Sequence, residues 1–112
     1  MQLFTAIINP QALAAVKTTR ESNGITGMTI SEASGYGRQR GHSEVYRGAE
    51  YTVDFVPKIR LGVLVEDLDA RSVVDVIMSA ASSGRIGDGK IWTVPVEDVA
   101  RVRTGERGSD AI

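Results

Sequence analysis

The most regular feature of this 112-residue chain is an apolar repeat at helical spacing in its second half. After Asp67, an N-cap candidate, apolar residues recur three or four positions apart, and Gly84 stands where a helix would end. The members of the stripe are Ala70, Val73, Val74, Ile77, Met78 and Ala81. The pattern predicts an amphipathic helix, which has to pack on a second layer of structure.

Shorter segments predict the rest of that structure. Apolar or alternating runs indicate strands at 3–8, 27–34, 52–65 and 90–94, with 99–102 as a further short candidate. Asn9 and Pro10 predict the start of a first helix that ends near Gly24. The order is that of an α+β, ferredoxin-like βαββαβ sandwich, in which 3–8 is a central strand. Both helices of that fold cover one face, so the other apolar face predicts self-association.

A long polar connection joins the second and third strands, and 37–55 is its core. Connections of this length in a small domain are typically disordered linkers or binding loops. Glycines give it backbone freedom, Arg and Gln side chains give it donors, and Tyr46 and Tyr51 give it amphipathic surface. We interpret it as a target-binding loop.

Composition excludes several classes of protein. The chain has no cysteine and one histidine, which excludes disulfides, thiolate metal sites and a multi-histidine site within one chain. A net charge of -1 disfavours nonspecific nucleic-acid binding. No apolar run is long enough to cross a bilayer, and the N-terminus lacks a signal pattern. We expect a cytoplasmic protein with one domain over residues 1–112.

Residues 82–90 contain the spacing of a phosphate-binding loop, GRIGDGK, in which backbone N–H groups and Lys90 would surround phosphate oxygens. The match is partial, because Ile91 replaces the magnesium-binding Ser or Thr and a strand follows. A plain glycine turn ordered by Asp88 is an equally good explanation. Arg101 and Arg103 would share one side of an extended segment and suit polyphosphate, although a solvated strand edge is the commoner explanation.

Two further residues favour a ligand cleft, and few favour catalysis. Lys58 lies where the long loop joins the third strand and can reach into a cleft there. The carbonyl of Gln39 suits a hard cation already held by phosphates. His42 has no nucleophile beside it, and Trp92 is expected in the core. We therefore expect no enzyme, with at most feeble ATP hydrolysis.

Two motifs, YRGAEY at 46–51 and GRIGDGKIW at 84–92, resemble those of the PII nitrogen-regulatory signal-transduction proteins. Further stretches agree in register along the chain: GITGMT at 24–29, GYGRQ at 35–39, VDFVPK at 53–58 and VRTGE at 102–106. The resemblance implies a homotrimer with nucleotide sites in the clefts between subunits. It also implies a C-terminal loop or tail at 102–112.

The resemblance further implies which residues bind ligands. Those similar to ATP- or ADP-binding residues of the family are Ile7, Thr29, Gly35, Gly37, Arg38, Gln39, Leu64, Gly87, Asp88, Gly89, Lys90, Arg101 and Arg103. Magnesium would be held by the ATP phosphates and Gln39. The effector 2-oxoglutarate would complete the metal's shell and pair its carboxylate with Lys58.

Partners follow from the same resemblance. Loop 37–55 would dock on an ammonium transporter or a nitrogen-metabolism enzyme, with Arg47 entering a pore and recruitment to the membrane being reversible. A nucleotidyltransferase would uridylylate or adenylylate Tyr51. Asn9 and Gln11 replace a basic and an aromatic residue of the family, so we expect a weaker or altered 2-oxoglutarate response. The alternative is a PII-like nucleotide-binding trimer with an altered or lost response to 2-oxoglutarate and other targets.

Overall fold

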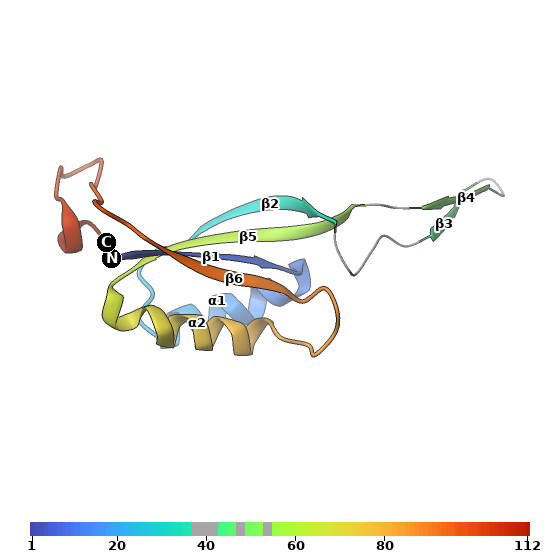
Figure 1. The fold of residues 1–112 in the computed structure, drawn as a ribbon, viewed down its shortest axis with the longest axis horizontal. Coiled ribbons are helices and arrows are strands. Elements are labelled where there is room, and N and C mark those ends of the chain that lie inside the picture. Colours follow the sequence, from blue (N-terminus) through green and yellow to red (C-terminus); the bar gives the residue numbers. More distant parts are fainter. Residues whose placement is uncertain (37–42, 47–48, 53–54) are drawn as a thin grey trace.

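The structure is a computed structural model that describes residues 1–36, 43–46, 49–52 and 55–112. Its centre is a four-stranded antiparallel sheet with the strand order β2-β5-β1-β6. The strands are β1 (Gln2–Ile8), β2 (Thr29–Gly35), β5 (Val56–Val65) and β6 (Gly89–Pro95). Helices α1 (Leu13–Ser22) and α2 (Asp67–Ala81) lie on one face of the sheet (Figure 1). The ferredoxin-like α+β arrangement is thereby confirmed, with β1 as a central strand.

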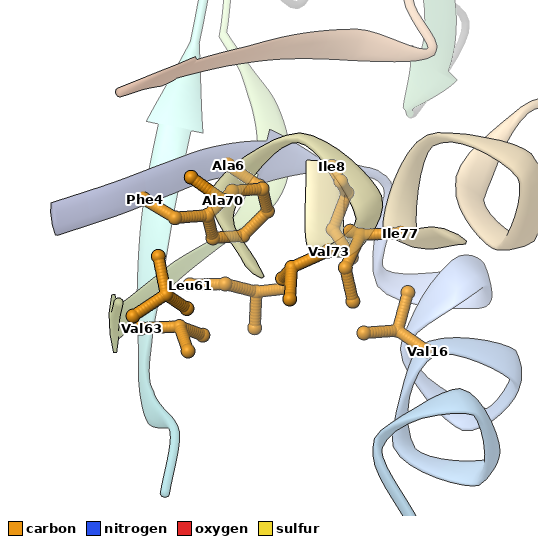
Figure 2. Close-up of a cluster of buried hydrophobic side chains, with 10 residues drawn as sticks. Phe4, Ala6, Ile8, Val16, Leu61, Val63, Ala70, Val73 and Ile77 are labelled. Carbon is orange, nitrogen blue, oxygen red and sulfur yellow. The ribbon is translucent and has the colours of Figure 1, made fainter. Parts of the chain in front are cut away.

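The core lies between this sheet and the two helices (Figure 2). Alternate residues of β1 and β5 point to the helices because side chains alternate along a strand. Phe4, Ala6 and Leu61 have no exposed surface, and Ile77 of α2 is equally buried. Ala6 is paired with Leu61 on one side and Ile91 on the other, so the register aligns apolar residues across three strands.

Neither α1 nor α2 covers the opposite face of the sheet (Figure 1). Leu3, Thr5 and Ile7 of β1 share this face with Leu64 of β5, as the pairing of Leu3 with Leu64 shows. Trp92 of β6, which is paired with Thr5, is 43% exposed. Trp92 is therefore not a core residue, and its prediction as one was wrong. Self-association through this face stays a prediction.

A second sheet lies within the long connection between β2 and β5. Strands β3 (Ser43–Tyr46) and β4 (Ala49–Thr52) pair antiparallel as a hairpin, which lies beyond the end of the main sheet in Figure 1. The predicted strand 52–65 is thus too long, because Thr52 pairs with Ser43 while β5 begins at Val56. Residues 37–42, 47–48 and 53–54 of the loop fall outside the described residues.

The C-terminal residues turn instead of forming the short strand predicted at 99–102. Ala100 makes one isolated bridge to Arg107, and the Gly105 N–H donates to the Arg101 carbonyl at 2.8 Å. Gly105 has a φ of 74°, which permits this reversal. Two 3-10 segments, η1 (Pro10–Ala12) and η2 (Gly108–Ala111), complete the structure. None of the helices described here combines the length and apolarity needed to cross a membrane.

Candidate functional site

The loop between α2 and β6 is ordered by the carboxylate of Asp88. This carboxylate accepts hydrogen bonds from the Ser83 N–H at 2.7 Å, the Gly84 N–H at 2.9 Å and, still closer, the Ser83 hydroxyl. The Ser83 hydroxyl is the main cause that lowers the pKa of Asp88, and the backbone donors add to it. Asp88 thus orders the turn, which is the structural role that the sequence had left open.

The same loop is held tightly against β1. Gly89 pairs with Ile8, and its φ of 111° is one that L side chains rarely adopt. A Cβ added to Gly89 would lie 1.7 Å from the Ile7 carbonyl oxygen, so only glycine fits there. Gly87 also has a positive φ, of 95°. These glycines allow the loop backbone to start a strand directly beside the end of β1.

Lys58 joins three segments at this end of the sheet. It is 8% exposed, and its Nζ donates to Asn9 Oδ1 and to the Gly87 carbonyl oxygen, both at 2.6 Å. Burial lowers the pKa of Lys58, and the nearby Asp88 carboxylate partly opposes that shift. Asn9 precedes η1 but makes no side-chain cap, because its amide oxygen faces Lys58. The mostly buried ammonium group of Lys58 thus places a positive charge at this end of the sheet, and such a charge attracts an anion.

A cavity of about 730 Å³ opens beside these groups. Its lining brings together six of the predicted binding residues: Ile7, Gly35, Lys58, Gly87, Gly89 and Lys90. Tyr36 and Trp92 also line it, and the sequence reasoning had missed both. Trp92 follows Lys90 by two residues on β6, and this spacing was the available signal that both face the same side.

The remaining predicted residues with described positions lie elsewhere. Thr29 and Leu64 line a separate cavity of about 610 Å³ together with Ala111 and Ile112. Arg101 Nη1 pairs with Glu106 Oε1 at 3.2 Å. The prediction that Arg101 and Arg103 extend from one side of a strand was wrong, because the chain turns between them and Gly105.

The loop that carries Lys90 and the C-terminal arginines lie at opposite ends of the main sheet, whereas Thr29, through its partner Gly62, is level with Thr5 in the middle of β1. Ile8 pairs with Gly89 at one end of β1, whereas Gln2 pairs with Pro95 at the other, where the C-terminal residues begin (Figure 1). The seven residues of β1 separate the two ends by roughly 20 Å at the usual strand rise. One chain therefore does not bring Arg101 and Arg103 to the loop that carries Lys90.

Several predicted residues lie outside the described part of the chain. Gly37, Arg38, Gln39 and Arg47 are among them, so the magnesium and docking assignments remain predictions. The backbone of Tyr51 belongs to β4, at the hairpin. Within the described ranges, no three His, Asp or Glu side chains gather as metal ligands.

The chain matches the family model described as nitrogen regulatory protein P-II over residues 1–106. It is 53% identical to the nitrogen regulatory protein P-II of Azospirillum brasilense, over the full length of both chains. The proteins of the same description from Rhizobium meliloti and Pasteurella multocida are 52% and 49% identical, again over the full length of both chains.

Proposed function

Because the chain belongs to the nitrogen regulatory protein P-II family, we propose that this nitrogen-signalling regulator senses ATP and ADP in clefts between identical subunits. The observation that carries the proposal is the separation of the Lys90 loop from Arg101 and Arg103 by about the length of β1. A ligand that needs both groups has to lie between two copies of the chain.

The end with Lys90 has the chemistry of a nucleotide site. Its cavity of about 730 Å³ is within the size range of small-molecule sites. Ile7, Tyr36 and Trp92 offer apolar and aromatic surface to a base, and Lys90 with the Gly87 and Gly89 backbone offers positive charge and N–H groups to phosphates. Magnesium on the ATP phosphates would neutralise charge, with Gln39 as its protein ligand.

The other end supplies what that cavity lacks. Arg101 and Arg103 belong to the C-terminal residues there, and Arg101 Nη2 donates to Ile112, which lines the same cavity as Thr29 and Leu64. A second copy would bring the arginines to the phosphates. Such a contact uses different surfaces on the two copies. Repeated contacts of this kind close into a ring when the rotation from one copy to the next permits it. A homotrimer is the ring that the family resemblance implies. The open face with Trp92 provides apolar area for that contact.

The site lies at the base of the long loop, which supports coupling between ligand and partner binding. Gly35 and Val56 flank the connection that contains β3 and β4, and both line the nucleotide cavity. A ligand that prefers one loop arrangement shifts the population toward it by its difference in affinity. The proposed partners are an ammonium transporter, which Arg47 would enter, and nitrogen-metabolism enzymes. Docking on the transporter would recruit this cytoplasmic regulator reversibly to the membrane.

Calorimetry with ATP and ADP tests the nucleotide site. We expect one nucleotide per chain, and at least roughly tenfold weaker binding after Lys90→Ala or Arg103→Ala, since each removes a charged phosphate contact. Lys17→Ala is the matched control, because Lys17 is an exposed cation on α1. Sedimentation of the same samples should give a trimer. A lone subunit, or unchanged affinity in both cleft variants, would refute the proposal.

Modification of the loop has its own test. A nucleotide attached to the Tyr51 hydroxyl adds charge and bulk at the proposed docking hairpin. Tyr51→Phe should abolish uridylylation or adenylylation by a nucleotidyltransferase and leave ATP affinity unchanged. If Tyr51→Phe is still nucleotidylylated, a different residue is the acceptor.

The contact between Asn9 and Lys58 favours a second candidate, in which the response to 2-oxoglutarate is weakened or lost. The Asn9 oxygen lies 2.6 Å from the ammonium group that an effector carboxylate would need. A carboxylate must therefore displace Asn9 or share Lys58 with it. Asn9 is uncharged, so it adds no positive charge that would attract the carboxylate.

Titration of 2-oxoglutarate in the presence of magnesium-ATP separates the two candidates. We expect Asn9→Lys to bind the effector more tightly than the unmodified chain, because it removes the acceptor and adds a positive charge. Ala14→Lys adds the same charge at an exposed helix position and serves as the control. Equal affinities in all three proteins would exclude a role for Asn9.

A further inference from the structure

Arg101 is bound by groups of its own C-terminal segment, which we define as residues 98–112. Its Nη1 donates to Glu106 Oε1 and its Nη2 to the Ile112 backbone oxygen, each at 3.2 Å. Its backbone N–H also donates to the Glu106 carbonyl oxygen at 2.8 Å. Each of the two terminal nitrogens of the guanidinium group thus gives one hydrogen bond inside the segment.

A nucleotide phosphate would contact the same two nitrogens. A guanidinium group binds phosphate best through two parallel N–H donors, and here Nη1 and Nη2 each already give one N–H to the segment. The Glu106 carboxylate also places a negative charge where a phosphate would approach, and like charges disfavour each other. We infer that Glu106 competes with nucleotide phosphates for Arg101 and so lowers the nucleotide affinity of the site. This inference rests on the proposed nucleotide site.

The segment has a second tie that does not involve Arg101. Arg107 Nη1 pairs with Asp98 Oδ2 at 2.5 Å, and Ala100 bridges to Arg107. Loss of the Glu106 contact therefore leaves Arg107 still joined to Asp98 and Ala100. Asp98 consequently offers a control for Glu106, since both are carboxylates that pair with an arginine of the same segment.

The expected change in nucleotide affinity follows from the solvent exposure of Arg101 and Glu106. The Arg101 and Glu106 side chains are 38% and 45% exposed, so water and salt weaken their attraction. Exposed ion pairs of this kind correspond to roughly a two- to fivefold change in an equilibrium constant. Glu106→Gln should tighten ATP and ADP binding by about that factor, and the gain should shrink at high salt.

The experiment is calorimetry of ATP, ADP and adenosine on the full chain and four variants: Glu106→Gln, Asp98→Asn, Arg101→Ala and the double variant Arg101→Ala with Glu106→Gln. Glu106→Gln should tighten ATP and ADP binding and leave adenosine binding unchanged, because adenosine carries no phosphate. Asp98→Asn removes the same charge from the same segment and should match the unmodified chain. In an Arg101→Ala background, Glu106→Gln should give no gain.

If the unmodified chain binds ATP and Glu106→Gln binds it equally or more weakly, the inference is overturned while the proposed function stands. An equal gain in Asp98→Asn would also overturn it, because general charge would then be the cause. ATP binding seen only in Glu106→Gln would support a strong competition. Failure of all variants to bind nucleotide would overturn both proposals.

Discussion

Among the glycines whose surroundings the structure describes, Gly89 is the one at which a single methyl group should be most damaging. Gly89→Ala would place its Cβ 1.7 Å from the Ile7 carbonyl oxygen and 2.8 Å from the Ile7 carbonyl carbon. Both atoms belong to the backbone of the central strand β1, so no flexible side chain can move aside. The substitution therefore has to shift β6, or the loop before it, away from β1.

The expected cost has two parts. A non-glycine residue in a sparsely populated backbone region costs roughly 1–3 kcal/mol. Overpacking against well-packed neighbours costs about 1–3 kcal/mol more. We therefore expect Gly89→Ala to lower the free energy of unfolding by about 4 kcal/mol, which is a large part of the roughly 5–15 kcal/mol of a typical domain.

Gly84→Ala is the matched control, because Gly84 has a φ of 77° but nothing within 4 Å of an added Cβ. It should cost only about 1–2 kcal/mol, the left-handed penalty alone. Urea unfolding at one fixed protein concentration, followed by the fluorescence of Trp92, measures both. The two variants should differ by about 3 kcal/mol, or roughly 12 °C in Tm. A difference below about 1 kcal/mol would refute the steric argument.

Three further predictions concern stability. The pKa of Asp88 is lowered, first by the Ser83 hydroxyl, so its contribution to stability is complete above about pH 4 and is lost as the pH falls through the lower folded-state pKa. The difference in the free energy of unfolding between the unmodified chain and Asp88→Asn should accordingly shrink below that pH in urea titrations. Leu61→Ala, at a site with no exposed surface, should cost about 2–5 kcal/mol, whereas Leu68→Ala, 96% exposed, should stay within about 0.5 kcal/mol by the same assay. Lys58→Met leaves two acceptors without their ammonium donor and should cost about 1–3 kcal/mol; a variant as stable as the parent in thermal melts would contradict this.

Local patterns in the sequence were sufficient for the central fold. Helix α2 is predicted well because its apolar stripe depends only on spacing, and the structure begins it at Asp67 and ends it at Ala81. Its N-cap is Glu66, so the expected N-cap at Asp67 was wrong by one residue. The start of β5 was less predictable. Alternation continues through 49–65, and the sequence does not say that 49–52 pairs with 43–46 instead of the main sheet.

The sequence predicted which residues belong to the candidate site better than it predicted how they contact one another. The glycines and Lys90 are adjacent in sequence, so their grouping followed from the motif. The bond from Lys58 to Asn9 joins residues 49 positions apart and depends on strand register. The pairing of Arg101 with Glu106 depends on a turn at Gly105, whereas the one-residue spacing of the arginines had assumed an extended backbone.

The placement of Lys90 and Arg103 at opposite ends of β1 has a genetic consequence under the proposed function. Two inactive alleles, one with each residue replaced, should rescue one another when expressed together. In a mixed ring formed at random from equal amounts, about a quarter of the contacts between neighbours would combine an intact loop with an intact arginine. Complementation of this kind would be impossible if a single chain carried the whole binding surface.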